Sequence, residues 1–205
     1  MKSFLEYIRE QTSLLESAMH FFDIDGTIAI PQDVHVHVIN KQGKRVQSLS
    51  HSEFNTHKLE PGQRYDFSDF RSAKKFAKSQ PIMRVIQKIK TLSAKKNNSI
   101  AFNTARADFD NKDEFLNTFS NKFGINMNNI HVHRAGNITG DASIAKKKAE
   151  IIRNKIKNGN YKHVSLYDDD TSNLDAFLSL KKEFPHMNFN AHHVDHTGRF
   201  RRYTG

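Results

Sequence analysis

Two carboxylates at the end of an apolar run are the first residues in this chain that could take part in chemistry. Asp23 and Asp25 follow the run M-H-F-F, and Gly26 comes directly after them. Glycine allows a sharp turn, and a side chain at the end of a buried strand points into the crevice where open α/β sheets bind ligands. The pattern indicates a ligand site, and acidic residues in an ordinary turn are the alternative.

A second acidic cluster follows the apolar run S-L-Y and consists of Asp168, Asp169 and Asp170. Three adjacent carboxylates repel one another unless a cation or water neutralises them. Oxygen ligands without cysteine or a well-spaced histidine set favour Mg²⁺ over zinc. The sequence therefore predicts a magnesium site here, with a solvated acidic turn as the alternative.

Two weaker patterns lie between these clusters. Thr104 and Arg106 follow the apolar run S-I-A-F, where a hydroxyl and a guanidinium could hold a phosphoryl oxygen. Three lysines, Lys146 to Lys148, open a helical pattern. A lysine run is most often a solvated helix face, so each pattern carries weight only together with the others.

The elements that must position these residues alternate along the chain. Apolar runs predict strands over residues 19–23, 99–103, 130–133, 164–167 and 189–194. Apolar spacings of three and four predict helices over residues 2–17, 82–92, 115–123, 144–156 and 174–180. Alternating strands and helices predict an α/β fold with a doubly wound parallel sheet. Each of the four patterns then lies at a strand's carboxyl end or on the helix that leads to the next strand, so they converge on one crevice.

One stretch interrupts this alternation. Residues 28–80 contain a predicted hairpin with its turn at Gln42 and Gly43, followed by a helix over residues 70–78. We predict a core domain from residues 1–27 and 81–205 and a small insertion over residues 28–80. The basic C-terminal tail, from Gly198 onward, is expected to be loosely held.

Composition limits the class of protein. The 205 residues include 32 Lys and Arg against 22 Asp and Glu, a net charge of +10. That surplus favours polyanionic partners such as nucleic acid, anionic lipid or phosphorylated substrates. No cysteine is present, which excludes disulfides, thiolate zinc sites and thiol nucleophiles. Of the 12 histidines, several alternate along predicted strands, and solvated faces or polyanion contacts are preferred over a histidine metal site.

The same composition gives no membrane signal. No run reaches the ~18 apolar residues of a membrane span, and charged residues interrupt the first 22 residues where a signal peptide would be apolar. A cytoplasmic location is expected, and the oligomeric state is left open.

Taken together, the four patterns resemble the haloacid dehalogenase (HAD) superfamily. F-D-I-D-G-T is similar to its first motif, F-N-T-A-R to its second, K-K-K-A-E-I-I to its third and Y-D-D-D-T-S-N to its fourth. The resemblance covers residues 19–35 and 81–195. It implies a HAD-like, Rossmann-like doubly wound sheet, with the insertion at the position of the family's cap after the first strand.

The resemblance also implies residue roles. Asp23 would be the nucleophile that forms an aspartyl-phosphate, and Asp25 the general acid and then base. Thr104 would hydrogen-bond a phosphoryl oxygen, and Lys148, with Lys147 as the alternative, would neutralise charge. Thr27 and Arg106 are the further substrate-binding candidates.

The metal ligands implied by the resemblance are oxygen atoms around Mg²⁺. They are Asp23, the backbone carbonyl of Asp25, and Asp169, with Asp168 or Asp170 supporting. Asn173 stands where the family often has a second aspartate, which leaves the role of that position open.

The expected function is a Mg²⁺-dependent phosphohydrolase acting on nucleotide or nucleic-acid terminal phosphates. A small-molecule phosphomonoester phosphatase is the alternative within the same chemistry. A catalytically idle HAD scaffold that binds nucleic acid or a protein is the alternative from another class.

Overall fold

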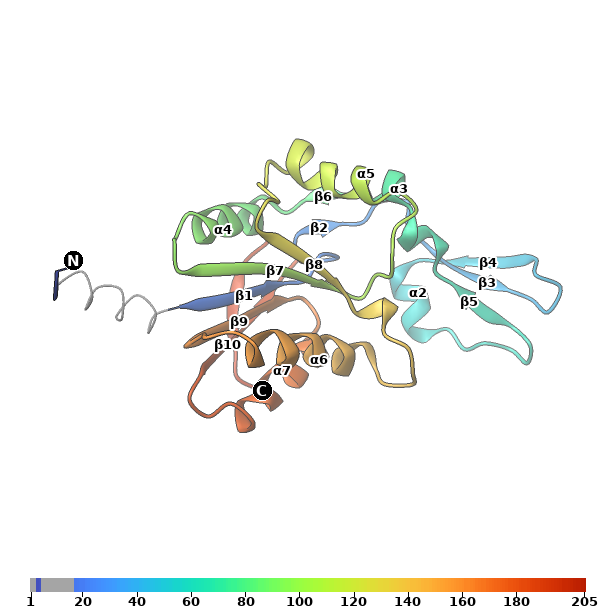
Figure 1. Cartoon of the computed structure of the whole chain (residues 1–205). Coiled ribbons are helices and arrows are strands. Elements are labelled where there is room, and N and C mark those ends of the chain that lie inside the picture. Colours follow the sequence, from blue (N-terminus) through green and yellow to red (C-terminus); the bar gives the residue numbers. More distant parts are fainter. Residues whose placement is uncertain (1–2, 5–16) are drawn as a thin grey trace.

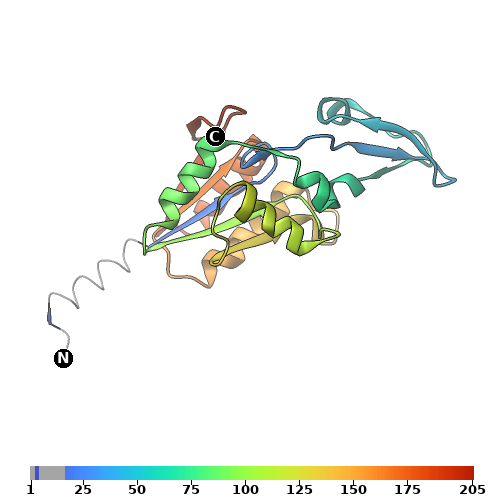
Figure 2. The same cartoon turned by 90° about the horizontal axis from the view of Figure 1, so that it is seen from above.

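The computed structural model describes residues 3–4 and 17–205 (Figure 1). The helix predicted over residues 2–17 falls almost entirely outside the described residues. The rest of the chain forms a central sheet with helices on both faces and a smaller sheet that projects from one end (Figures 1 and 2).

The central sheet has six strands in the order β11-β10-β9-β1-β7-β8. Their bounds are β1 Ala18–Phe22, β7 Asn98–Thr104, β8 Ile130–Arg134, β9 His163–Asp168, β10 Asn188–Val194 and β11 Phe200–Tyr203. All neighbouring pairs are parallel except β10 and β11. The chain proceeds from β1 outward to β7 and β8, then returns to the other side of β1 for β9. This order matches the predicted doubly wound parallel sheet, and its strand order reverses between β1 and β9, where open α/β sheets form a crevice.

Helices cover the two faces because side chains alternate along β1. Met19 and Phe21 pack with α6 (Ile144–Lys157) and α7 (Thr171–Ser179). Phe22 packs on the opposite face, where the helices are α3 (Ala73–Phe76), α4 (Met83–Ser93) and α5 (Lys112–Asn117). Short helical turns complete the layers: η1 Ser68–Arg71, η2 Thr118–Lys122, η3 Ala135–Asn137 and η4 Leu180–Lys182. None of the helices within the described residues is long and apolar enough to cross a membrane.

The predicted helix over residues 115–123 begins earlier than its apolar spacing indicated. Asn111 caps α5, because its side-chain oxygen accepts a hydrogen bond from the Glu114 amide. After α5 the chain continues as the wider π-helical turn η2. Apolar spacing alone does not mark a cap that lies outside the apolar stripe.

The insertion forms a sheet of its own beyond the carboxyl ends of the central strands (Figures 1 and 2). Its strands are β3 Val36–Ile39, β4 Arg45–Leu49 and β5 Arg64–Asp66, with the short helix α2 (His51–Thr56) beside them. The predicted hairpin turn is present, and Gly43 adopts a φ of 77° there. A separate apolar cluster of Val36, Val38 and Leu49 holds this sheet.

The end of the insertion belongs to the core by packing. The helix predicted over residues 70–78 is divided between η1 and α3, and Phe76 packs against Phe115 and Phe119 in the core. Both chain connections to the insertion pair with each other, as β2 (Ala29–Ile30) and β6 (Gln80–Pro81).

The C-terminal tail is not loosely held, and that prediction is wrong. Residues Phe200–Tyr203 form β11, which pairs antiparallel with β10 at the edge of the sheet. Phe200 packs against the Tyr167 ring, and the Tyr203 hydroxyl donates to Asp175 on α7 at 2.7 Å. The two aromatic side chains thus anchor a segment whose basic residues suggested fraying.

Candidate active site

The two acidic patterns meet because their strands are neighbours. Asp23 comes directly after β1, and Asp168 ends β9. The Asp23 amide donates to the Tyr167 carbonyl at 2.9 Å, so the parallel pairing continues one residue beyond β1. This register brings the Asp23 and Asp168 carboxylates to the same point of the crevice.

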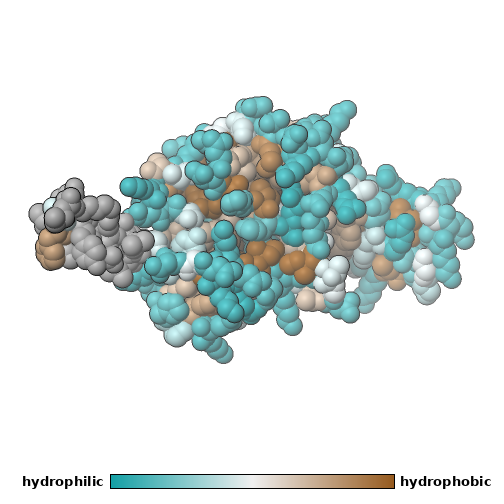
Figure 3. All heavy atoms as spheres, viewed as in Figure 1, coloured by the Kyte–Doolittle hydropathy of each residue, from teal (hydrophilic) through white to brown (hydrophobic). Residues whose placement is uncertain are grey.

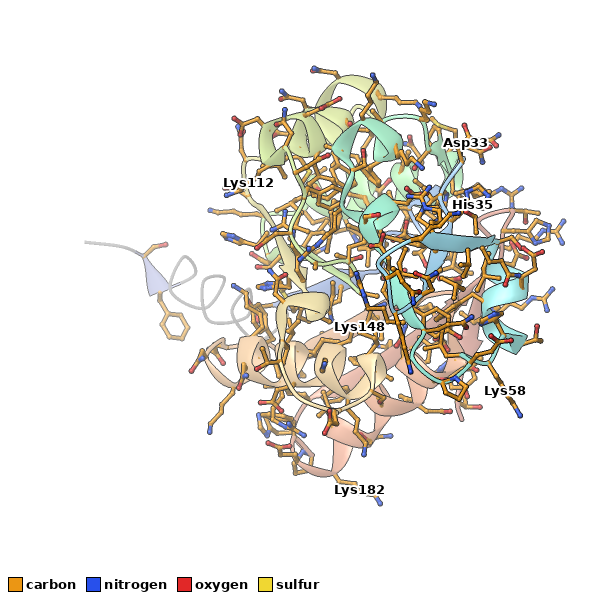
Figure 4. All side chains as sticks on the ribbon, turned by 90° about the vertical axis from the view of Figure 1, so that its right-hand side faces the viewer. Asp33, His35, Lys58, Lys112, Lys148 and Lys182 are labelled. Atoms are coloured by element: carbon orange, nitrogen blue, oxygen red, sulfur yellow. The ribbon has the colours of Figure 1, made fainter. Side chains whose placement is uncertain are left out.

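Lys148 joins the two carboxylates. The side chain is 4% exposed, and its Nζ lies 2.6 Å from Asp23 Oδ1 and 3.0 Å from Asp168 Oδ2. Figure 4 shows Lys148 inside the molecule, whereas Lys58, Lys112 and Lys182 lie at its periphery. The helix places it there because Ala149 and Ile152 on the same side of α6 pack onto the sheet.

The other lysines of the run do not reach the carboxylates. Lys146 is exposed and Lys147 is half-buried, and both line a surface hollow between α6 and α7. Of the two candidates that the sequence left open, the structure places Lys148 at the site. Asn103, buried on β7, donates to the Lys148 main-chain carbonyl at 3.0 Å and so fixes this part of α6.

A candidate metal centre lies beside this lysine. One carboxylate oxygen from each of Asp23, Asp168 and Asp169 lies within 4.8 Å of the other two. Gly26 makes the close approach possible: its φ is 79°, and a Cβ there would lie 2.2 Å from Asp169 Oδ2. The Thr27 hydroxyl donates to Asp169 Oδ1 at 3.1 Å. The predicted substrate-binding Thr27 therefore holds a carboxylate in this structure.

Asp170 is not brought into this group. Its carboxylate caps α7 by accepting from the Ser172 amide at 2.8 Å, which turns it away from the crevice. The buried place is taken by Asp168, whose Oδ1 accepts from the Asp170 amide and from Asn173 Nδ2. Asn173 thus orients Asp168 through its side-chain amide. This is the role in the structure of the position where the resembled family often has a second aspartate.

Arg106 also lies differently from its predicted place on the substrate. Its Nε and Nη2 donate to the two oxygens of Asp25 at 2.7 and 2.6 Å, a bidentate pair. Its Nη1 donates to the Phe70 carbonyl of the insertion at 2.8 Å. The Arg106 side chain is 1% exposed, and its guanidinium lies over the rings of Phe70, Phe76 and Phe109. Arg106 therefore links Asp25 to the insertion and faces away from solvent.

Thr104 ends β7 beside Asp23's strand and is fully buried. Its Oγ1 accepts a hydrogen bond from the Arg106 amide at 3.2 Å. The predicted contact of Thr104 with a phosphoryl oxygen stays a prediction.

The electrostatics of the site reflect an excess of negative charge. Burial raises the pKa of Asp23 well above its usual value, opposed by Lys148 and reinforced by Asp168 and Asp169. Although burial alone would lower it, the pKa of Lys148 is raised by Asp23 and Asp168, so its amine stays protonated. Desolvation by the surrounding protein raises the pKa of Asp169 to about 6, and the negative charge of Asp168 adds to the rise. One ammonium does not balance three carboxylates, so the site favours an additional cation.

Three functional positions were missed or underweighted from sequence. The sequence indicates only a supporting place for Asp168 and gives Asn103 no role beyond its place in the F-N-T-A-R motif. It does not point to the Phe70 carbonyl. A buried asparagine within an apolar strand is a signal that could have found Asn103, because a buried amide needs a partner. The Phe70 carbonyl carries no signal in the sequence.

Comparison with known proteins adds little to this geometry. No protein-family model matches the chain, and no curated protein matches it. Among solved structures, the chain is similar to the HAD domain of the effector protein Lem4 from Legionella pneumophila, an inactive mutant, with 12% sequence identity and a TM-score of 0.46. The match covers 91% of this chain and 89% of that one. At that identity and TM-score nothing about this chain's activity follows from the likeness.

Proposed function

We propose that this protein is a Mg²⁺-dependent phosphohydrolase that works through an aspartyl-phosphate on Asp23. The observation that carries the proposal is the contact of one buried lysine, Lys148, with two buried carboxylates at the sheet's crevice. A structural ion pair would be satisfied by one carboxylate, whereas Asp23 and Asp168 together with Asp169 leave negative charge unbalanced. That excess, at a topological switch point, is typical of a catalytic cation site.

The donor set fits magnesium. Three carboxylates offer hard oxygen ligands, and no histidine or thiolate competes in this group. Asp23, Asp168 and Asp169 would hold the ion, and the Asp25 carbonyl, two residues beyond Asp23, is a further ligand suggested by the family resemblance. When bound, Mg²⁺ supplies positive charge that lets a phosphate dianion approach a carboxylate.

The chain's own residues account for the reaction. An Asp23 oxygen attacks phosphorus, and the bond from phosphorus to the leaving oxygen breaks as Asp25 gives that oxygen a proton. Asp25 then takes a proton from water, which attacks the phosphorus of the aspartyl-phosphate. Inorganic phosphate leaves and Asp23 is free again. Lys148 and the Thr104 hydroxyl stabilise the negative charge on the transferred group throughout.

Asp25 must move for this role. Both of its oxygens are held by Arg106 in the structure, so proton transfer to a substrate requires release of at least one contact. Because Arg106 also binds the Phe70 carbonyl, movement of the insertion and release of Asp25 are coupled in this proposal.

The test is hydrolysis of a generic aryl phosphate by the full chain with Mg²⁺ and with EDTA. Asp23→Asn should abolish turnover, because an amide is not a nucleophile for phosphorus, while circular dichroism stays unchanged. Asp141→Asn, an exposed aspartate ahead of α6, is the matched control and should keep full activity. Phosphate retained on the wild-type chain after acid quench, and absent from Asp23→Asn, would support the covalent step.

Two results would contradict the proposal. Turnover above a few per cent in Asp23→Asn would exclude an aspartyl-phosphate at this residue. A folded, Mg²⁺-loaded wild-type chain without turnover on aryl phosphates, nucleotides and phosphorylated oligonucleotides would support the idle scaffold.

A further inference from the structure

A basic groove lies between α4 and β11, outside the residues of the candidate active site. Its volume is about 570 Å³. Figure 2 shows the C-terminal strand beside α4. The groove is lined by Arg84, Gln87, Gly198, Arg199, Phe200 and Arg201. Three of its six lining residues are arginines and none of the six is acidic; the Asp195 carboxylate lies in the turn that bears Arg199.

The groove is held in a fixed shape by the turn between β10 and β11. Asp195 Oδ1 accepts from the Thr197 amide, the Thr197 hydroxyl and the Arg199 amide. Gly198 has a φ of 77°, and a Cβ there would lie 2.6 Å from Ile82 on the approach to α4. The turn is therefore packed tightly on α4, and the backbone that presents Arg199 is ordered before any ligand binds.

The arginines of the groove have unused charge. Within residues 17–205, none of Arg84, Arg199 and Arg201 forms an ion pair, and all three are exposed. Further cations lie near the same face. These cations are Lys88 on α4 and Arg202 on β11. Both lie close enough to His192 on β10 that their charges add to the lowering of its pKa by burial. Unpaired guanidinium groups on a preformed surface are suited to phosphate, which they bind through two parallel hydrogen bonds.

The groove adjoins the edge of the sheet that carries the candidate active site. In the register of β9 and β10, His193 is opposite Asp168, so the turn that follows β10 lies at the same edge as the acidic loop. On the other side, the Ile82 amide at the start of α4 donates to the Ile28 carbonyl, in the loop that follows Asp25. A linear ligand could therefore reach from the groove to the crevice.

We propose that this groove binds the backbone phosphates of a single-stranded nucleic acid whose terminal phosphate is the substrate. The inference rests on the proposed phosphohydrolase function and gives it a substrate class. A single strand is favoured because its end is narrow enough to bring a phosphate to Asp23, which is only 5% exposed. An acidic peptide offers carboxylates at irregular spacing, where nucleic acid offers a regular row of phosphates.

The test compares two charge-matched double variants of the full chain. Arg84→Gln with Arg199→Gln removes two charges from the groove, and Lys181→Gln with Lys182→Gln removes two exposed charges from η4. Fluorescence anisotropy measures binding of a short DNA strand that carries a 5′ dye and a 3′ phosphate, across a salt series. Both double variants and their parent also carry Asp23→Asn, which stops turnover during the binding measurement. The groove variant should bind at least about fivefold more weakly and lose about 1.4 from the log–log salt slope, at ~0.7 per phosphate neutralised. The control should bind as the parent does.

Aryl phosphate turnover separates this proposal from the function on which it rests. With Asp23 restored, the groove variant should hydrolyse aryl phosphate as the wild type does but lose kcat/KM on the phosphorylated strand. Equal DNA affinity and salt slope in the two double variants would overturn the groove assignment and leave the phosphohydrolase standing. DNA binding that depends on the groove, in a wild-type chain without turnover, would support the groove assignment and overturn the phosphohydrolase. Binding of a poly-glutamate peptide that is tighter than DNA binding and equally lost in the groove variant would assign the groove to an acidic protein.

Discussion

A lysine between two carboxylates can be a structural buried ion pair or part of a reaction site, and the two roles respond differently to mutation. Breaking a structural pair leaves an uncompensated buried charge and costs stability, typically about 3–5 kcal/mol. Loss of a charge-stabilising group at a reacting centre costs rate. At Lys148 the second effect should be separable, because Mg²⁺ bound by Asp23 and Asp168 would compensate the lost charge for folding.

We expect Lys148→Met to lower kcat on aryl phosphate by ~10²–10³-fold with Mg²⁺ present, the usual loss for one charge-stabilising group. Lys147→Met should change kcat by less than about twofold, because Lys147 lies on the surface hollow between α6 and α7. Steady-state kinetics on both variants, with circular dichroism to confirm folding, checks this. A large loss of kcat in Lys147→Met, together with a nearly unchanged kcat in Lys148→Met, would contradict the placement of Lys148.

Arg106 should affect kcat and leave KM nearly unchanged, because it holds Asp25 and does not face solvent. Arg106→Lys keeps the buried charge but cannot bind both Asp25 oxygens in one plane. We expect kcat to fall by ~10–10²-fold, the scale of a misplaced catalytic group, with KM within about twofold. Arg71→Lys, an exposed arginine of the insertion, is the control. If KM rises and kcat is retained, Arg106 binds the substrate phosphate as the sequence first suggested.

At this scale the sequence could predict which residues meet but not how their side chains are oriented. Asp23 and Lys148 follow from strand ends and helix spacing, because those patterns fix position along the chain. The directions of Thr27, Arg106 and Asp170 depend on partners from distant segments, such as the Phe70 carbonyl, and no local pattern encodes these.

At the scale of elements, β11 shows how pairing can outweigh composition. The run F-R-R-Y holds two arginines, and its basic character suggested a frayed end. Its aromatic residues instead pack on opposite faces of the sheet edge, Phe200 on Tyr167 and Tyr203 toward α7. The five parallel strands and four of their helices could be predicted because their apolar periods are long enough to be distinctive, whereas a four-residue edge strand has almost no period.

The central strand β1 contains a titratable group that should make folding sensitive to acid. Burial lowers the pKa of His20 to about 4, and Lys88 adds to the effect. The unfolded chain then binds more protons than the folded chain between pH 4 and the ordinary value of 6.5, so stability falls as the pH drops through that window. This contribution amounts to about 2 kcal/mol lost between pH 7.5 and pH 5.0.

We expect His20→Leu to reduce this pH-dependent loss. Urea denaturation at pH 7.5 and 5.0 should show a smaller decrease in the free energy of unfolding than in the wild type, by about 2 kcal/mol. His131→Leu, at an exposed histidine on β8, is the control and should behave as the wild type does. Equal pH dependence in His20→Leu and wild type would show that His20 is not the group responsible.

At the scale of the whole molecule, charge is segregated. The net charge is +10, and the surface is largely hydrophilic in the view of Figure 3. Yet the crevice at the sheet's carboxyl edge gathers two buried carboxylates, Asp23 and Asp168, and the exposed Asp169 carboxylate beside Lys148. A basic exterior attracts an anionic substrate by long-range forces, while the acidic crevice repels it until a cation is bound. The arrangement predicts that the metal-free crevice is a site of strain that the ion relieves.

Mg²⁺ should therefore raise the melting temperature, and the rise should depend on Asp169. Binding only to the folded chain at a hundredfold excess over Kd stabilises it by about 2.7 kcal/mol, or roughly 5–10 °C for a chain of this size. Asp169→Asn keeps an acceptor for the Thr27 hydroxyl but removes one ligand charge. We expect this variant to melt higher than wild type in EDTA, because one repelling carboxylate is gone, and to gain little from Mg²⁺.

The same measurement has a predicted pH dependence. The pKa of the Asp169 carboxyl is raised to about 6, so below that pH a proton occupies the site that the metal needs. The Mg²⁺-induced rise should be largest near pH 7.5 and should shrink as the pH falls through 6, and Asp141→Asn should follow the wild type at every pH. An equal Mg²⁺-induced rise in Asp169→Asn and wild type would place the ion elsewhere, and with it the assignment of the acidic crevice as a metal centre would fail.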